Sequence, residues 1–285
     1  AGIGPNGQKG IDENVELYKN WNGAGDGRFK VMMGPHAPYT CPPDYIRKVR
    51  DVAEKYDMPI HIHLSETKGE VENCEKEYHM TPIALMDSLG LFERPTLAAH
   101  CVHVTDDDIR IMKEKHVCAA HNPASNLKLA SGIAPVPKMR KAGITVGIGT
   151  DGASSNNKLD MFAEMRLTAL IHKAANYDPF AITAKEAVDM ATKDGAKCLG
   201  YDNLGELKEG FLADIILVDR TGFHWKPRFD SVSLAVYAGN SMDVDTVIIN
   251  GRPVMEHKEL LTIDTEKMDA EVKRVTKKLY AFTKK

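Results

Sequence analysis

The chain has 285 residues, of which 43% are hydrophobic and 27% charged, and its net charge is −3 at pH 7. This composition is that of a globular protein with enough apolar residues to bury a sizeable core. The basic residues are scattered except near the carboxyl terminus, which argues against a nucleic-acid surface or a polybasic membrane anchor. No apolar run approaches the roughly 18 residues of a membrane span. We therefore expect a small-molecule partner, and neither nucleic acid nor a membrane.

The cysteines and the amino-terminal residues bear on location. The five cysteines are odd in number and form no Cys-x-x-Cys pair, which is typical of reduced thiols in a cytoplasmic protein. Residues 1–7 have a loop-like composition without the basic start and apolar core of a signal peptide. The sequence thus predicts a cytoplasmic protein.

Strand-like and helix-like segments alternate along the first two thirds of the chain. Short apolar runs predict strands at 29–34, 58–64, 96–100, 116–121 and 143–149. Periodic stretches predict helices at 42–56, 70–79, 82–89, 159–175 and 183–199, and a further helix capped by Thr105 and the three aspartates after it. This alternation predicts a parallel sheet wrapped by helices, as in a (β/α) barrel, of whose eight units five are identified.

The pattern changes after Asn203. Residues 205–218 and 247–255 are strand-like, and the second segment contains an Asn250-Gly251 turn that indicates a hairpin. These strands suggest half of a small β-sandwich. Residues 265–282 form an amphipathic pattern that predicts a terminal helix packed on an apolar face of Met268, Val272, Val275 and Leu279. The expected division is a barrel part at 1–202, a sandwich part at 203–263 and a terminal helix at 264–285.

Histidines and carboxylates follow three of the predicted strands. They are His63-Leu-Ser-Glu66, His100, and Gly149-Thr-Asp151-Gly152. Because the carboxyl ends of parallel strands meet at one edge, these side chains are the parts of a metal-assisted hydrolytic site. A catalytic zinc normally takes three protein ligands and water, and these strings supply His63, Asp151 and, as a further candidate, His100. The predicted site is therefore incomplete.

Together with three further strings, these residues carry a family resemblance. The additional strings are Pro35-His36-Ala-Pro, Ala99-His100-Cys-Val-His103 and His121-Asn-Pro-Ala-Ser-Asn126. In this order, from about Ile11 to the carboxyl terminus, the chain resembles the amidohydrolase superfamily, in its chlorohydrolase and aminohydrolase branch. Within that branch it is most similar to the 5-methylthioadenosine/S-adenosylhomocysteine deaminases.

The resemblance implies a fold and a cofactor. It implies a TIM barrel flanked by a β-sandwich built from both chain ends, with one divalent metal, zinc in the first place and iron as the alternative. It also implies a His-x-His pair on the first barrel strand, which no part of this chain matches. We therefore expect the sequence to begin at about the fourth strand of the barrel, to contain strands 4–8, and to lack the first half of the sandwich.

The resemblance also implies roles for individual residues. His63 and Asp151 would hold the metal, and His100 and Asp151 would take the proton from metal-bound water. Glu66 would protonate the ring nitrogen beside the amine-bearing carbon, so that an adenine nucleoside becomes its inosine analogue and ammonia. His36, Glu66 and Asp151 would contact the substrate, and the loops at 122–126 and 154–157 would shape its pocket.

One departure from the family concerns the substrate. The subfamily often has an arginine that grips a carboxylate where this chain reads Gln8-Lys9-Gly10. That difference favours methylthioadenosine over S-adenosylhomocysteine.

Two other functions remain open. One is different chemistry on the same residues, such as guanine or cytosine deamination, triazine dechlorination or cyclic amide hydrolysis. Amide hydrolysis usually needs a bridging lysine, and no strand-end lysine is present in the pattern. The other is a catalytically silent partial barrel whose open sheet edges pair with another chain. A homo-oligomer is compatible with every alternative, since many relatives form one.

Several candidate residues have simpler structural explanations. His61 shares a strand face with His63, but the resemblance selects only His63. His103 is expected to pack or cap a loop, whereas His121 could line the pocket or hold its loop. Asp106, Asp107 and Asp108 fit a helix start better than a cation site, and the glycines around Gly149 fit a tight strand end better than a phosphate loop. The histidines expected to lack partners are His79, His116, His172, His224 and His257.

Overall fold

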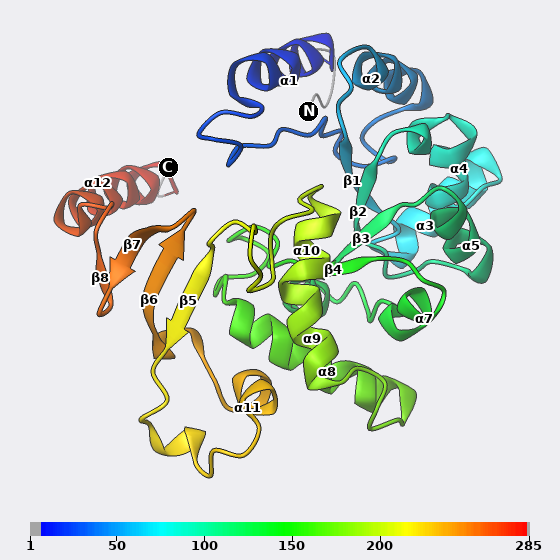
Figure 1. The fold of residues 1–285 in the computed structure, drawn as a ribbon. Coiled ribbons are helices and arrows are strands. Elements are labelled where there is room, and N and C mark those ends of the chain that lie inside the picture. Colours follow the sequence, from blue (N-terminus) through cyan, green and yellow to red (C-terminus); the bar gives the residue numbers. More distant parts are fainter. Residues whose placement is uncertain (1–6, 284–285) are drawn as a thin grey trace.

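The computed structural model describes residues 7–283, which fold around two separate four-stranded sheets (Figure 1). The first sheet is parallel, with strand order β1-β2-β3-β4. Its strands are β1 (Ile60–Leu64), β2 (Thr96–His100), β3 (Cys118–His121) and β4 (Val146–Ile148). Four of the five predicted parallel strands are therefore confirmed.

The strand predicted at 29–34 is wrong except for one residue. Met33 forms a single parallel bridge with Ile60, and the residues around it bond to side chains instead of a strand. Asn14 accepts from the Gly34 amide at 3.0 Å and donates to the Met32 carbonyl at 3.1 Å. Asn22 accepts from the Val31 amide at 3.0 Å. Side chains of helix α1 (Gly7–Trp21), which the sequence did not predict, and of the residue that follows it thus satisfy backbone groups that a strand neighbour would otherwise pair.

Helices cover one face of the parallel sheet (Figure 1). They are α2 (Pro43–Lys55), α3 (Lys68–Tyr78), α4 (Pro82–Ser88), α5 (Asp106–Glu114) and α7 (Val136–Lys141). The strand residues facing them, such as Ile60, Ile62 and Val146, are fully buried. Thr105 and Asp108 form a capping box at the start of α5, which confirms the helix-start interpretation of the aspartates.

A short helix lies against the opposite face. Helix α10 (Lys193–Cys198) crosses the sheet so closely that a Cβ on Gly147 would lie 3.0 Å from the Gly195 Cα. The helix predicted at 183–199 is interrupted, because Thr192 has a non-helical backbone between α9 (Ala184–Ala191) and α10. The remaining helices of this half are α6 (Pro123–Lys128) and α8 (Met161–Asn176), with a 3₁₀ turn η1 (Leu91–Glu93).

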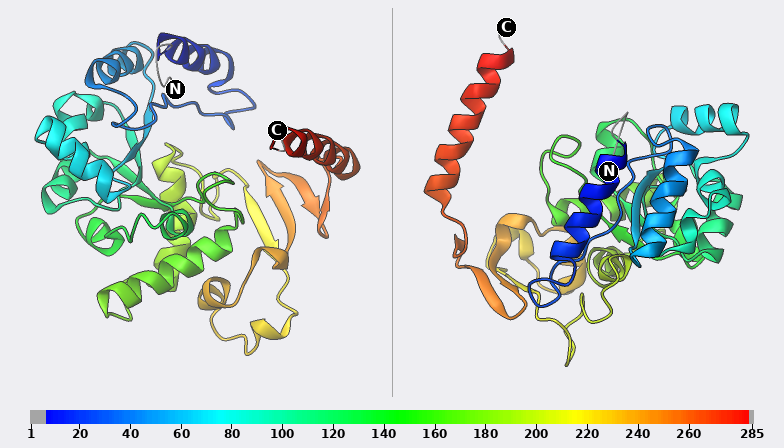
Figure 2. Two further views of the ribbon diagram at one scale, coloured as in Figure 1. Left: turned by 180° about the vertical axis from the view of Figure 1, so that it is seen from behind. Right: turned by 90° about the horizontal axis from the view of Figure 1, so that it is seen from above.

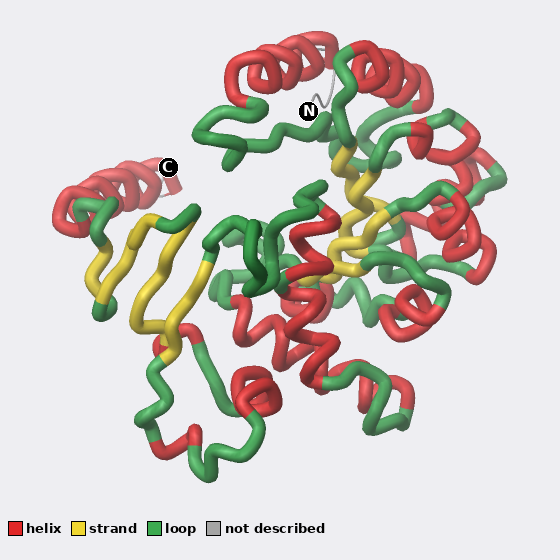
Figure 3. The backbone as a smooth tube through the Cα atoms, viewed as in Figure 1, coloured by secondary structure: helices red, strands yellow, loops and turns green. Residues whose placement is uncertain are grey.

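The second sheet is antiparallel and lies on the other side of α10 (Figures 1 and 3). It contains β5 (Ile215–Val218), β6 (Val244–Ile249), β7 (Arg252–Glu256) and β8 (Glu259–Leu260). Asn250 and Gly251 have positive φ values of 48° and 74°, which confirms the predicted hairpin turn. Between β5 and β6 lie η2 (Phe223–Trp225), α11 (Ser231–Tyr237) and η3 (Ser241–Asp243).

Helix α12 (Thr265–Thr283) confirms the predicted terminal helix but not its packing. The side chains of the expected buried face are 45% to 60% exposed: Met268, Val272, Val275 and Leu279. In the right view of Figure 2 the helix stands clear of both sheets. The periodicity thus predicted the helix correctly, but no element within residues 7–283 covers its apolar face.

Two remaining sequence predictions concern the termini and membranes. The loop expected at residues 1–7 lies outside the described residues as far as residue 6, and Gly7 already begins α1. No helix within residues 7–283 combines the length and hydropathy of a membrane span.

Candidate active site

Four of the predicted site residues meet at the carboxyl edge of the parallel sheet. The rings of His63 and His100 are stacked with centroids 5.5 Å apart. The His100 Nε2 lies 3.8 Å from Glu66 Oε2 and 4.0 Å from Asp151 Oδ2. Three segments separated in sequence thus place two imidazoles and two carboxylates in one cluster.

The backbone at this edge adopts left-handed conformations. Ser65, His100 and Asp151 have φ values of 53°, 73° and 62° at or just beyond their strand ends. Such conformations cost a non-glycine residue about 1–3 kcal/mol and accumulate at functional sites. In strand register His100 is paired with Leu64, which faces the helices, yet its ring stacks on His63. We attribute the turn of His100 into the cluster to this local backbone conformation.

His63 is held in one tautomer by the segment before β1. Its Nδ1 donates a hydrogen bond to the His36 carbonyl oxygen at 2.7 Å, and its backbone amide donates to the same oxygen at 3.0 Å. Because Nδ1 carries the proton, Nε2 retains a lone pair. A backbone carbonyl orienting the other ring nitrogen is the usual arrangement behind a metal-binding histidine.

His100 is oriented in the same way by a side chain. Its Nδ1 donates to Asn126 Oδ1 at 2.8 Å, and both residues are buried. The lone pair therefore resides on Nε2, the atom nearest to Glu66 and Asp151. A neutral imidazole can accept a proton at this atom.

Asp151 is fixed as a carboxylate by donors of its own loop and of α6. Ser125 Oγ donates to Oδ2 and the Gly152 amide to Oδ1, both at 2.6 Å. Burial alone would raise the pKa of Asp151, but these two bonds and the nearby His100 and His63 bring the pKa below its ordinary value. Asp151 is therefore ionised at neutral pH. The role of Ser125 was not predicted from the sequence.

Gly149 leaves room for the loop that carries these donors. A Cβ at this position would lie 2.4 Å from Asn122 Oδ1, and the Gly149 amide donates to the His121 carbonyl at 2.9 Å. This close approach confirms that a tight strand end explains the glycine.

A buried carboxylate that the sequence analysis missed supports Glu66. Glu70 accepts hydrogen bonds from the backbone amides of Ser65 at 2.9 Å and Glu66 at 2.8 Å. Burial raises the pKa of Glu70 in spite of these bonds. The Glu66 side chain itself accepts from Ser131 Oγ at 3.2 Å. Only the position of Glu70, four residues after Glu66 in the first turn of α3, could have indicated its role.

Two other predicted histidines border the cluster. The His36 ring lies 5.0 Å from that of His63, and its Nδ1 is 2.8 Å from Thr40 Oγ1. Burial, and then the proximity of His63, lower the pKa of His36. The ring centroids of His61 and His63 lie 6.0 Å apart, and His61 is exposed. His36 therefore contributes a backbone carbonyl to the site in addition to its predicted substrate-facing ring.

Most histidines expected to be structural have partners. His103 Nε2 donates to the Ser131 carbonyl at 2.7 Å and so fixes the loop that supplies Ser131 to Glu66, which agrees with its predicted loop role. The prediction that His172 lacks a partner is wrong, since its Nε2 lies 3.2 Å from His121 Nε2 in a buried pair. His224 and His257 also have partners, in Asp243 at 2.9 Å and Asp245 at 3.3 Å.

The loop at 154–157 is tied to helices. Lys128 on α6 donates to the Ser154 carbonyl and to Asn157 Oδ1, both at 2.7 Å. Asn156 donates to Glu164 on α8 at 2.7 Å, and Glu164 also accepts from the Ala124 amide at 3.1 Å. Glu164 therefore joins the two loops that follow β3 and β4.

The side chains of the cluster are of the kind that binds a metal, but they are too few to complete a metal site. Within residues 7–283 no group of three or more His, Cys, Asp or Glu side chains is arranged to hold a metal ion. His63 Nε2, with its oriented lone pair, and the ionised Asp151 are donors that zinc accepts, yet a catalytic zinc takes three protein ligands. These two residues therefore fit part of a zinc site.

A parallel sheet with helices on its face and histidines and carboxylates at its carboxyl edge is typical of a metal-dependent hydrolase. The profile of the amidohydrolase family matches residues 6–254, and the chain belongs to this family.

Two named proteins are similar to this chain over most of its length. A protein of Dictyoglomus thermophilum named 5-methylthioadenosine/S-adenosylhomocysteine deaminase is 53% identical over 96% of this chain and 64% of its own length. A protein of the same name from Pelotomaculum thermopropionicum is 50% identical over 96% of this chain and 63% of its length. The chain thus spans somewhat less than two thirds of these curated relatives.

Solved structures show the same fold. A zinc-bound adenosine deaminase from Xanthomonas campestris superposes with a TM-score of 0.91 at 34% identity, over 95% of this chain and 62% of that one. A mutant atrazine chlorohydrolase from Arthrobacter aurescens, complexed with zinc and atraton, superposes with a TM-score of 0.88 at 27% identity. The match covers 94% of this chain and 60% of that one.

Proposed function

We propose that this chain forms part of a metal-dependent hydrolytic deaminase of adenine nucleosides. The substrates would be 5-methylthioadenosine, S-adenosylhomocysteine or adenosine, and the products the inosine analogue and ammonia. The observation that carries the proposal is the position of His100 Nε2 between Glu66 and Asp151, beside a His63 whose Nε2 lone pair is free to bind a ligand. The names of the relatives support the same reaction.

The proposal includes an architecture. The Met33 bridge and strands β1–β4 would represent strands 4–8 of a (β/α)₈ barrel within residues 1–202. Residues 203–263 would form part of a composite β-sandwich, and residues 264–285 a separate terminal helix. The free cysteines favour a cytoplasmic location as part of the same proposal.

His63 and Asp151 would hold one divalent metal, zinc in the first place and iron as the alternative, together with ligands that the described residues do not provide. When bound, such a metal lowers the pKa of a coordinated water to about 7 and so supplies a nucleophile at neutral pH.

The acid and base roles follow from the hydrogen bonds. His100 would accept a proton at Nε2, because its Nδ1 proton is already bound to Asn126. Glu66, whose backbone is fixed by Glu70, would protonate the substrate ring nitrogen next to the amine-bearing carbon. Protonation there makes that carbon electrophilic and helps ammonia to leave. Asp151, which is a carboxylate at neutral pH, would share with His100 the role of proton acceptor.

His36, Glu66 and Asp151 would contact the substrate. At the position where the subfamily often has an arginine, Lys9 lies in an exposed pair with Glu13 at 3.5 Å, and Gln8 donates to Asp12 at 2.9 Å. Both side chains are thus engaged within α1. We propose methylthioadenosine as the preferred substrate, because it has no carboxylate that requires a cation.

Two alternatives are each favoured by one observation. The structural similarity to a triazine hydrolase favours other hydrolytic chemistry on the same cluster, with guanine or cytosine deamination in the same group. The incomplete ligand set among residues 7–283 favours an inactive partial barrel that associates with another chain or copy.

The proposal is tested on the purified chain by intact mass, metal content and ammonia release. When ligands from outside the described residues complete the site, we expect about one zinc or iron per chain and ammonia release from methylthioadenosine, S-adenosylhomocysteine or adenosine. Ammonia from guanine or cytosine, or chloride from a triazine, would favour the other hydrolytic chemistry. Absence of metal together with absence of turnover, at a mass matching 285 residues, would favour the inactive partial barrel.

A further inference from the structure

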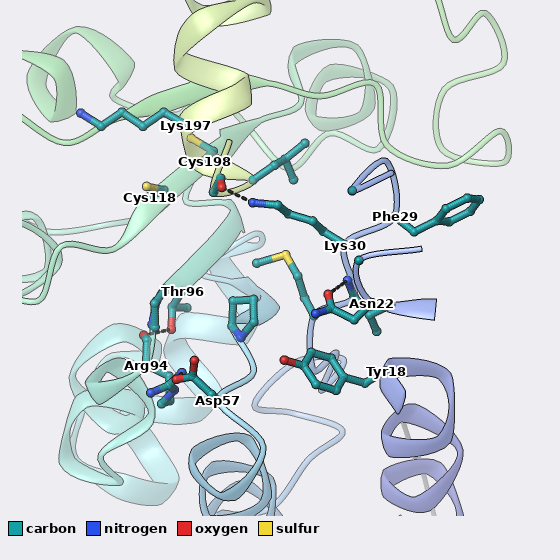
Figure 4. Close-up of a pocket in the computed structure, with 18 of the residues that line it drawn as sticks. Tyr18, Asn22, Phe29, Lys30, Asp57, Arg94, Thr96, Cys118, Lys197 and Cys198 are labelled. Carbon is teal, nitrogen blue, oxygen red and sulfur yellow. Dashed lines mark hydrogen bonds and ion pairs between the residues drawn. The ribbon is translucent and has the colours of Figure 1, made fainter. Parts of the chain in front are cut away.

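A pocket of about 560 Å³ lies at the amino-terminal edge of the parallel sheet, opposite to the edge that carries the candidate active site. Residues just before or at the starts of the strands line it, among them Pro59, Thr96 and Cys118, and the end of α10 contributes Cys198. Figure 4 shows the sulfur atoms of Cys118 and Cys198 near each other on its wall. None of the residues assigned to the candidate active site lines this pocket.

The two thiols interact directly. The Cys198 thiol is close enough to lower the pKa of Cys118 as a hydrogen-bond donor, and the same interaction raises the pKa of Cys198. Cys198 Sγ also lies 3.9 Å from the carbonyl oxygens of Ala119 and Thr145, so it sits over the neighbouring strands β3 and β4. The missing side chain of Gly147 lets α10 approach β4 closely, since a Cβ there would lie 3.0 Å from the Gly195 Cα.

Cys118 differs from the other cysteines in access and charge. It is half-buried, whereas the remaining four free cysteines, Cys41, Cys74, Cys101 and Cys198, are buried. The hydrogen bond from Cys198 lowers the pKa of Cys118 against the opposing effect of burial, and Lys197 lowers it further. Burial raises the pKa of Cys74 to about 11. Because the thiolate is the attacking species and the other four thiols are buried, Cys118 is the expected nucleophile.

We propose that Cys118 and Cys198 form a redox-active dithiol, which a low-molecular-weight disulfide such as oxidised glutathione converts into an internal disulfide. The Cys118 thiolate attacks one sulfur of the small disulfide, breaks its S–S bond and releases one thiolate. Cys198 then attacks the Cys118 sulfur of the mixed disulfide, gives up its proton and displaces the second small thiolate. The protein loses two protons and two electrons, and one small disulfide becomes two thiols.

The internal disulfide would join α10 to β3. Strand β3 leads directly into the His121–Asn126 segment that orients His100 through Asn126. The cross-link would therefore restrain a strand of the active-site sheet from its opposite edge. The proposal concerns thiol chemistry alone and stands apart from the proposed deaminase activity.

The test uses the full chain, reduced, desalted and then incubated with oxidised glutathione. We expect the number of alkylatable thiols to fall from five to three, with the intact mass lower by about 2 Da before alkylation. Proteolysis should yield a Cys118 peptide linked to a Cys198 peptide, and dithiothreitol should restore all five thiols. Retention of five thiols, glutathione adducts without an internal bond, or a bond between other cysteines would each overturn the proposal.

Variants separate the two steps. Cys198→Ser should stop at a stable mixed disulfide on Cys118, and Cys118→Ser should show neither adduct nor internal bond. Cys74→Ser, at a buried site outside the pocket, should behave as the unmodified chain. Alanine at positions 118 and 198 replaces serine if circular dichroism shows that a serine variant does not fold. An internal disulfide that still forms in the Cys118 variants would contradict the proposal.

Discussion

The two sheets of this molecule differ in how completely the chain buries them. The parallel sheet β1–β4 packs fully buried residues such as Ile62 and Leu64 against its helices, whereas the antiparallel sheet β5–β8 and helix α12 expose residues such as Leu217 and Leu279. Each parallel strand is followed along the chain by helices that cover its face. Strands β6, β7 and β8 follow one another through short turns, and the longer connection between β5 and β6 places its helix α11 against α8 and α9. The comparison shows that a βα repeat buries itself from local sequence, while a hairpin sheet depends on surfaces contributed from elsewhere.

The largest expected effect is on catalysis at the edge of the parallel sheet. Glu66→Gln should lower kcat for ammonia release about 10²- to 10⁴-fold, because a glutamine cannot protonate the substrate ring. Steady-state kinetics on a metal-containing preparation measures this. Glu72→Gln, an exposed change on α3 beside the site, is the matched control and should leave kcat unchanged. Full activity of the Glu66 variant would exclude it as the proton donor.

The second prediction compares apolar residues of the two regions directly. Leu64→Ala should reduce the free energy of unfolding by about 2–5 kcal/mol, because it removes a fully buried side chain. Leu279→Ala on α12 should change it by less than about 0.5 kcal/mol, because that side chain is exposed. Urea denaturation measures both values. Equal losses would mean that α12 is covered in solution, and the contrast between the regions would then fail.

The third prediction concerns pH and the buried His121–His172 pair. Burial lowers the pKa of His172 from 6.5 to about 4, so the folded state holds it neutral while the unfolded state binds a proton first. The contribution of neutral His172 to the free energy of unfolding is fully present above pH 6.5. It is lost as the pH falls from about 6.5 to about 4, on the order of 3 kcal/mol in total. Urea denaturation at pH 7.5 and pH 4.5 should show this loss.

The pH effect should depend on the buried histidine itself. His172→Asn removes the titrating group and should reduce the pH dependence of unfolding, whereas His79→Asn, at an exposed position, should preserve it. An unchanged pH dependence in the His172 variant would assign the acid sensitivity to other groups.

The smallest expected effect concerns the support of Glu66. Glu70→Gln keeps the size of the side chain but replaces one of the two oxygens that accept the Ser65 and Glu66 amides. We expect a loss of about 1–3 kcal/mol in stability and a fall in kcat with little change in KM, because the backbone of the proton donor is displaced. Glu70→Asp, which retains both oxygens, should recover part of kcat. Loss of stability with an unchanged kcat would make Glu70 purely structural.

Much of the parallel half could be predicted from the sequence. Apolar runs identified four of its strands, and helical periodicity with the Thr105 cap identified most of the helices that follow them, but the short helices α6 and α7 after β3 were not predicted. The prediction of a strand at 29–34 was wrong because Asn14 of α1 and Asn22 just after it bond to the backbone of this segment, and these residues lie 9 to 20 positions from their partners. The prediction of the terminal helix was correct in its extent and wrong in its packing. Periodicity reveals an apolar face but not whether another element covers it.

The chemistry-bearing residues of the candidate site followed from the sequence, because histidines and carboxylates stood directly after predicted strands. The orientation of these side chains could not be predicted from the sequence. Local sequence determined the strand ends and the positions of His63, His100 and Asp151, since strand and turn preferences act over a few residues. Only the tertiary structure decided that the His36 carbonyl, Asn126 and Ser125 orient them and that Glu70 fixes the backbone of Glu66. The first three of these hydrogen bonds join residues 26 or 27 positions apart, and no local preference encodes contacts at that separation.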